Sequence, residues 1–200
     1  MHVPFWNKEI ETLDRAGICK IQAERLSDIL SWAFKTPFYA KRLAQAGINS
    51  PADFSGLEDI QRIPFTTKDD MRRAFPQGLM AVGMEEIVRV HSSSGTTGIP
   101  TVIYLTADDM ENWTDLLARS VTATGACGKD VFQNMMTYGL FTGGLGLHYG
   151  AERVGMTVIP IGGGNTKRQI QVMKDFQTTV LHITPSYLLH IHSKITDAKI

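Results

Sequence analysis

A run of small residues between two β-branched segments constrains this chain more than any other feature. The run is Ser92-Ser-Ser-Gly-Thr-Thr-Gly-Ile-Pro-Thr101, with Ile87 to Val90 before it and Val102 to Leu105 after it. β-Branched residues favour strands, so the pattern predicts two strands joined by a loop. Glycines let backbone N–H groups approach an anion and the hydroxyls add donors, so the loop suits a polyphosphate. A solvated hairpin loop is the alternative interpretation.

The loop differs from the common nucleotide-binding motifs. A Walker A loop needs a lysine directly after its second glycine, whereas Gly98 is followed by Ile99. The Walker loop and the dinucleotide fingerprint also lead into a helix, whereas a strand is predicted to follow this loop. These differences disfavour the usual nucleotide-binding folds.

The order of the predicted elements indicates an α/β fold with a small helical N-terminal part. In residues 1–85, a helical face is predicted from the spacing of Ile21, Leu26, Ile29, Leu30 and Ala33. A capping box from Thr67 to Asp70 is predicted to open a short helix. In residues 86–200, strands at 131–138, 158–161 and 180–184 alternate with helices, which predicts a layered βαβ domain with a largely parallel sheet. We therefore expect two domains, 1–85 and 86–200.

Composition and charge disfavour several classes of protein. Twenty Lys and Arg balance twenty Asp and Glu, so the positive charge of a nucleic-acid binder is missing. No apolar stretch approaches the ~18 residues of a membrane span, and the first residues do not resemble a secretory signal. Cys19 and Cys127 are too few for a disulfide framework or a four-cysteine zinc site. We expect a cytoplasmic protein with no metal site of its own and no nucleic-acid or membrane partner.

A second candidate site lies further along the chain. Tyr138 and Phe141 stand beside Gly143 and Gly144, which can make a flat apolar slot for a planar ligand. The alternative is that both aromatics belong to the core under a tight turn. The glycines at 162–164 either wrap a nucleotide at the carboxyl end of a strand or form a flexible turn before Thr166 caps a helix.

The ordered run from Ser92 to Thr101 resembles the phosphate-binding loop of the adenylate-forming enzymes, the superfamily of acyl-CoA synthetases, peptide-synthetase adenylation domains and luciferases. Within that superfamily the chain is similar to the phenylacetate–CoA ligase family. The similar segments are Pro-Phe-Thr-Thr-Lys-Asp-Asp-Met-Arg at 64–72, Tyr-Gly-Leu-Phe-Thr-Gly-Gly-Leu-Gly at 138–146 and His-Tyr-Gly-Ala-Glu-Arg at 148–153. The resemblance extends over nearly all 200 residues and covers about the first half of such an enzyme.

The resemblance implies a two-step ligase reaction. A carboxylate attacks the α-phosphate of ATP to give an acyl adenylate and pyrophosphate, and the thiol of coenzyme A then displaces AMP. The loop residues would embrace the β- and γ-phosphates, with Mg²⁺ nearby. These ATP-binding residues are Ser92, Ser93, Ser94, Gly95, Thr96, Thr97, Gly98 and Thr101.

Two further predictions concern the acid and a cation. The resemblance implies that Met136, Tyr138, Phe141, Gly143 and Gly144 line an arylacetate pocket. The family often has an aromatic at the place of Met136, and methionine adapts to several shapes, so the exact acid stays open. Lys68 is the nearest cation within a motif that could meet the phosphates, and a solvated lysine in a first helical turn is the alternative.

The expected function is that of the N-terminal portion of an ATP-dependent arylacetate–CoA ligase of phenylacetate catabolism. The groups that hold adenine and ribose in such enzymes, and the catalytic lysine, are expected beyond Ile200, so we expect the chain alone to be inactive. Association into a homo-oligomer is expected from apolar faces left uncovered. One alternative is a nucleotide-binding or regulatory module that kept the loop without ligase activity. Another is a domain that only shares the layered α/β architecture.

Overall fold

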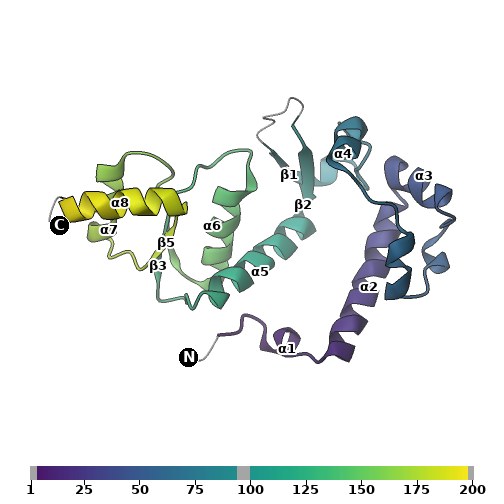
Figure 1. Cartoon of the computed structure of the whole chain (residues 1–200), viewed down its shortest axis with the longest axis horizontal. Coiled ribbons are helices and arrows are strands. Elements are labelled where there is room, and N and C mark those ends of the chain that lie inside the picture. Colours follow the sequence, from purple (N-terminus) through teal and green to yellow (C-terminus); the bar gives the residue numbers. More distant parts are fainter. Residues whose placement is uncertain (1–3, 94–99, 198–200) are drawn as a thin grey trace. The chain divides into compact units, whose positions relative to one another are not determined.

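Figure 1 shows a computed structural model, which describes residues 4–93 and 100–197. The chain divides into two units. One is Lys8–Ala107, and the other is the described part of Asp108–Ile200 together with that of Met1–Asn7. The domain boundary near residue 85 stays a prediction.

The unit Lys8–Ala107 consists mainly of short helices. They are α1 (Lys8–Glu11), α2 (Arg15–Ala33), α3 (Pro37–Gln45), the 3₁₀ turns η1 (Pro51–Asp53) and η2 (Leu57–Arg62), α4 (Lys68–Ala74) and the 3₁₀ turn η3 (Met84–Glu86). Their core is built on Leu30, Leu43 and Ile48, which are all buried. The predicted face of α2 is wrong at Ile29, which is 63% exposed. Ile29 lies about 100° around the helix from Leu30, at the margin of the apolar stripe.

Local capping explains where two of these helices begin and end. The Thr36 side chain accepts the N–H of Tyr39, and Pro37 occupies the first turn of α3. Gly47 follows this helix with a φ of 75°, a left-handed conformation that suits glycine. The capping box predicted for α4 is confirmed, because Thr67 and Asp70 exchange hydrogen bonds.

The same unit contains the predicted hairpin. Strands β1 (Ile87–Ser92) and β2 (Val102–Thr106) pair in antiparallel fashion, with Ser92 opposite Val102. A register irregularity lies between Ile87 and Arg89, at the end away from the Ser/Gly/Thr run. The hairpin therefore holds both ends of that run.

The second unit alternates strands and helices around a parallel sheet, as predicted. Its elements are α5 (Ala107–Ala123), β3 (Val131–Asn134), α6 (Thr142–Val154), β4 (Thr157–Ile159), α7 (Thr166–Asp175), β5 (Val180–His182) and α8 (Pro185–Asp197). The strand order is β4-β3-β5, and β3 is parallel to both neighbours. All three carboxyl ends therefore lie at one edge of the sheet, where open α/β sheets bind ligands.

Helices cover both faces of this sheet (Figure 1). On one face, Val121 of α5 and Ala151 of α6 pack with Phe132 of β3. On the other face, Ile170 of α7 and Ile191 of α8 pack together with Met135. This arrangement is the layered α/β architecture predicted from the sequence.

The strand predicted for residues 131–138 is too long. It ends at Asn134, because the side-chain oxygen of Asn134 accepts the N–H of Met136 at 3.1 Å. Such a bond to the residue two positions ahead replaces the ladder and turns the chain. The turn moves Tyr138 out of the strand into the segment before α6.

Two other observations bear on the expected class of protein. In the described ranges, no helix combines the length and apolarity that crossing a membrane requires. Cys19 and Cys127 are both free thiols.

Candidate functional site

Reciprocal hydrogen bonds close the base of the Ser/Gly/Thr run. The N–H of Ser93 donates to the carbonyl oxygen of Thr101 at 3.0 Å. The N–H of Thr101 donates to the Oγ of Ser93 at 3.0 Å. Ser92 is the last residue of β1, so three of the predicted phosphate-binding residues are placed around one strand end. Ser94, Gly95, Thr96, Thr97 and Gly98 lie outside the described residues.

The hydroxyl of Thr101 needs a partner. Its Oγ1 is buried and has no hydrogen-bond partner among residues 4–93 and 100–197. A buried hydroxyl left unsatisfied costs about 1–3 kcal/mol. A phosphate oxygen that accepted this hydroxyl would remove that cost, so the position suits an anion.

His91 is a residue near the loop that the sequence interpretation missed. It lies in β1 opposite Ile103 and is only 1% exposed. A histidine directly after the segment Ile87 to Val90 and directly before the serines was the available signal. Its side chain is therefore buried next to the end of the hairpin that carries the Ser/Gly/Thr run.

Lys68 is the first residue of α4 and is exposed. The capping box beside it is complete without the lysine, because Thr67 and Asp70 satisfy each other. The solvated lysine of a first helical turn therefore remains the alternative. A role for Lys68 at the phosphates stays a prediction.

Tyr138 lies at the centre of the second candidate site. Its hydroxyl is 3.1 Å from Nδ1 of His148, and Nε2 of His148 is 3.1 Å from a carboxylate oxygen of Glu152. Burial raises the pKa of the Tyr138 phenol above its usual value, and the negative charge of Glu152 acts in the same direction. Tyr138 therefore stays protonated at neutral pH.

Gly144 and the segment before Tyr138 are in close contact. A Cβ at Gly144 would lie 2.5 Å from the carbonyl oxygen of Thr137. The side chain of Asn134 also donates to the carbonyl oxygen of Gly144, at 2.7 Å. The structure thus brings together the end of β3, the first turn of α6 and two of the predicted pocket residues, Tyr138 and Gly144.

The other predicted pocket residues have different surroundings. Phe141 directly precedes α6 and is 62% exposed. A Cβ at Gly143 would lie 3.2 Å from the ring of Phe141, so these two adjoin each other. Met136 is half-buried in the turn after β3. Convergence of all five residues on one acid remains a prediction.

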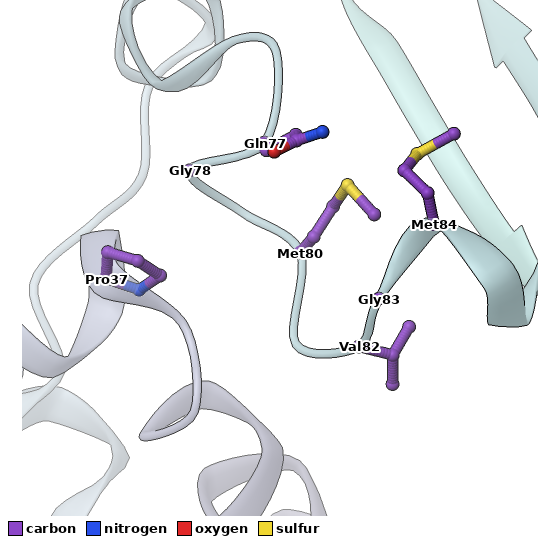
Figure 2. A pocket seen from close by; sticks show the side chains of 7 residues that line it. All are labelled: Pro37, Gln77, Gly78, Met80, Val82, Gly83 and Met84. Carbon is purple, nitrogen blue, oxygen red and sulfur yellow. The ribbon is translucent and has the colours of Figure 1, made fainter.

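Two hollows in the described parts lie elsewhere. One, of about 380 Å³, lies in the first unit between Pro37 and the segment from Gln77 to Met84, whose side chains are drawn in Figure 2. The other, of about 240 Å³, lies in the second unit between the Ile159 to Ile161 segment and α7. Neither hollow contains a predicted site residue.

Buried polar side chains at the carboxyl edge of the sheet were also missed. Asn134 is 0% exposed, and its oxygen accepts from Nδ1 of His182 at 3.0 Å. Burial lowers the pKa of His182, which favours the neutral ring that donates this bond. Gln133 donates to Gln169 of α7 at 2.8 Å. The signal available in the sequence was that two polar residues, Gln133 and Asn134, directly follow the apolar pair Val131-Phe132 in a predicted strand.

The glycine turn at 162–164 borders the same edge. Gly162 and Gly164 have positive φ angles of 75° and 88°, and Gln169 donates to both of their carbonyl oxygens. The expected cap is wrong by one residue, because Asn165 rather than Thr166 caps α7. A Cβ at Gly162 would lie 4.0 Å from the ring of Tyr138, so the turn lies beside the second candidate site. The two hydrogen bonds from Gln169 attach the turn to α7. Binding of a nucleotide by this turn stays a prediction.

Acidic and histidine side chains do not gather into a metal cage in the described parts of the chain. No group of three or more His, Cys, Asp or Glu that could hold a metal ion occurs there.

Comparison with known proteins gives relatives that cover nearly all of this chain. It is 48% identical over 184 residues to the phenylacetate–coenzyme A ligase of Thermus thermophilus, covering 92% of this chain and 41% of that protein. The ligase of the same name from Escherichia coli is 44% identical over 189 residues, covering 92% and 43%. That of Pseudomonas putida is 46% identical over 187 residues, covering 93% and 42%. No family model matches the chain.

Solved structures of 2-hydroxyisobutyryl-CoA ligase have the same fold. One in an open conformation, in complex with 2-HIB-AMP and CoA, gives a TM-score of 0.88 at 28% identity, covering 98% of this chain and 47% of that one. One in the thioesterification state gives 0.89 at 29% identity, covering 98% and 43%. The expected fold and the resemblance over most of this chain are confirmed. The chain spans less than half the length of each of these proteins.

Proposed function

We propose that this chain is the portion of an arylacetate–CoA ligase that holds the triphosphate of ATP and part of the acid substrate. The observation that carries the proposal is its identity of 42–48% to four phenylacetate–CoA ligases over more than nine-tenths of its length. The neighbouring structures carry an acyl adenylate and CoA, which are the intermediate and second substrate of such a reaction.

The proposed reaction has two steps. A carboxylate oxygen of the acid attacks the α-phosphorus of ATP, and the bond to pyrophosphate breaks. The thiol of coenzyme A then attacks the acyl carbon, and AMP leaves. The chain's own residues contribute to the first step by binding the leaving phosphates and by placing the acid for in-line attack.

The run from Ser92 to Thr101 is the proposed phosphate site. The closed hairpin end fixes Ser93 and Thr101, and the buried Thr101 hydroxyl lacks an acceptor among the described residues. Mg²⁺ is proposed to arrive with the triphosphate, because the described residues hold no carboxylate cage for it. Binding of the β- and γ-phosphates stabilises the charge that develops on pyrophosphate as it leaves.

The acid is proposed to bind beside Tyr138. This residue stands at the carboxyl edge of the parallel sheet, between the first turn of α6 and the Gly162 turn. Ligands of open α/β sheets bind at this edge. Met136, Phe141, Gly143 and Gly144 complete the proposed aryl slot.

Titration of ATP–Mg²⁺ into the 200-residue chain tests the phosphate site. The Thr101→Val variant keeps the shape of the side chain and removes its hydroxyl, so we expect ATP affinity to fall about tenfold or more. Thr122→Val is the matched control, because Thr122 Oγ1 in α5 is also buried without a partner in the described ranges. We expect this control to bind ATP as the wild type does.

Comparison of ATP with AMP makes the test specific for the phosphates. We expect ATP to bind more tightly than AMP, because only ATP carries the β- and γ-phosphates. Equal affinities for the two nucleotides, or equal effects of the two valine variants, would overturn the phosphate site. A chain that binds ATP but releases no pyrophosphate with phenylacetate, even when combined with the remaining part of a relative, would indicate a nucleotide-binding module instead.

A further inference from the structure

Tyr138, His148 and Glu152 form a chain of polar contacts at the carboxyl edge of the sheet. The two nitrogens of His148 are each 3.1 Å from a partner, Nδ1 from the Tyr138 hydroxyl and Nε2 from Glu152. His148 and Glu152 are four residues apart on α6, so they share a face of the helix. A carboxylate only accepts, so Nε2–H donates to Glu152, and in that tautomer Nδ1 accepts from the phenol.

This arrangement determines what Tyr138 can offer to a ligand. Its proton is engaged by His148, and burial keeps the pKa of the phenol raised, so the proton stays in place. The ring is also held edge-on against His148, with centroids 5.8 Å apart and planes at 83°. Asn134 also interacts with this hydroxyl by a side-chain hydrogen bond. The ring face is therefore the group left for a ligand, and it suits an apolar planar group rather than a hydrogen-bond acceptor.

Exposure to solvent increases from the partly buried His148 to the exposed Glu152. The side chain of His148 is 18% exposed, whereas that of Glu152 is 52% exposed. An exposed ion pair contributes little by itself, while a hydrogen bond shielded from water fixes geometry. His148 is therefore the residue of the three that transmits order to the tyrosine ring.

We propose that His148 is a positioning residue that holds the Tyr138 ring by its hydroxyl, and that the fixed ring selects aryl acids over flexible aliphatic acids. The inference rests on the proposed function, because it takes the acid to bind beside Tyr138. A ring that is ordered before binding loses less freedom when a planar ligand packs on it. Supporting contacts of this kind keep a site within the geometry that its ligand needs.

Two substitutions of His148 distinguish the contact made by Nδ1 from the contact made by Nε2. Asparagine at 148 places a polar atom near the position of Nδ1, so His148→Asn keeps an acceptor for Tyr138. Glutamine places its polar atoms near Nε2, so His148→Gln keeps the link to Glu152 and releases the tyrosine. Tyr138→Phe removes the hydroxyl and keeps the ring. Tyr149→Phe is the control, because it removes a neighbouring hydroxyl and keeps the ring that packs edge-on against His148, with ring centroids 5.4 Å apart.

Titration of phenylacetate and of hexanoate into the 200-residue chain measures selectivity. We expect His148→Gln and Tyr138→Phe to weaken phenylacetate binding about fivefold to tenfold, with hexanoate affected less. His148→Asn and Tyr149→Phe should stay within about twofold of the wild type. The double variant Tyr138→Phe/His148→Gln should bind no worse than either single variant, because both remove one contact.

Nitrogen-15 NMR of the histidine ring gives a readout that needs no ligand. Tyr138→Phe should shift the Nδ1 resonance of His148, and Tyr149→Phe should leave it in place. An unshifted Nδ1 resonance, additive losses in the double variant, or His148→Asn as weak as His148→Gln would each overturn the inference. A wild-type chain that binds ATP–Mg²⁺ but not phenylacetate would also overturn it and leave the phosphate site standing. Failure to bind ATP would count against the proposed function itself.

Discussion

Gly143 and Gly144 are neighbours in the first turn of α6, but a side chain would meet different surroundings at each position. A Cβ at Gly144 would collide with the backbone of Thr137, at 2.5 Å from its carbonyl oxygen. A Cβ at Gly143 would meet the ring of Phe141 at 3.2 Å, and this contact is with an exposed side chain rather than with backbone. Only the first contact forces the segment before Tyr138 to move.

We therefore expect the two alanine variants to differ in stability. Gly144→Ala should lower the free energy of unfolding by about 1–3 kcal/mol, as overpacking does. Gly143→Ala should change it by less than about 1 kcal/mol, because the gain in helix propensity offsets the small contact. Urea unfolding followed by far-UV circular dichroism measures both. Equal losses in the two variants would contradict the packing described for Gly144.

At the scale of single elements, Asp70 ties the start of α4 to α3. Its carboxylate accepts from the backbone and hydroxyl of Thr67, at 2.9 and 2.8 Å, and from Arg73 at 2.6 Å. Arg42 of α3 lies 3.2 Å from the same carboxylate. The Thr67 N–H, more than the two guanidinium groups, holds the pKa of Asp70 well below its usual value. The carboxylate therefore favours the folded state only while it is ionised.

The sign of the pH dependence follows from that lowered pKa. The contribution of Asp70 is complete above the unfolded pKa of about 3.9, and it is lost as the pH falls through the lower folded value. Asp70→Asn should reduce stability at neutral pH and flatten its decline between about pH 5 and pH 2. Unfolding in urea at a series of pH values measures this.

Asp69 provides the control for that experiment. It is adjacent to Asp70, and its side chain is 72% exposed and pairs with Arg72 within the same helix. Asp69→Asn should change stability less than Asp70→Asn and leave the acid decline in place. Equal effects of the two substitutions would show that the link to Thr67 and α3 contributes nothing.

The sequence predicted elements well where a local signal marks them. The capping box of α4 is such a signal, and it is confirmed. The start of α6 at Thr142 carries no such signal, because the paired glycines Gly143 and Gly144 disfavour a helix by propensity. The two glycines nevertheless form the first turn of α6, where Gly144 packs on the backbone of Thr137. This is a tertiary contact, and no local sequence pattern indicates it.

At the scale of the whole chain, each unit has its own core. Leu30, Leu43 and Ile48 form the buried cluster of Lys8–Ala107. The clusters around Phe132 and Met135 belong to the other unit. Separate cores predict that destabilising one unit leaves the other protected.

Hydrogen exchange with mass spectrometry tests that expectation. Leu43→Ala removes a side chain that is 1% exposed, which destabilises its unit by about 2–5 kcal/mol. Exchange should accelerate in α2 and α3 and stay unchanged in β3 and α6. Phe132→Ala should give the reverse pattern. Faster exchange throughout the chain in both variants would show that the two units unfold together.

The candidate site could be predicted only in part at this scale. The hairpin that carries the Ser/Gly/Thr run follows from the order of residues along the chain, and that hairpin is present. The surroundings of Tyr138 could not be predicted, because they depend on where β3 ends and on the parallel order β4-β3-β5. His148 and Glu152 at helical spacing were visible in the sequence, but nothing there linked them to Tyr138.

The hydrogen bonds of the Asn134 side chain limit which residues can replace it. Its amide group donates to the carbonyl of Gly144 and accepts from the N–H of Met136 and from His182, so aspartate would lose a donor. The partners at 144 and 136 are backbone atoms, which any residue there supplies, whereas His182 contributes its side chain. We therefore expect positions 134 and 182 to change together among descendants of this sequence.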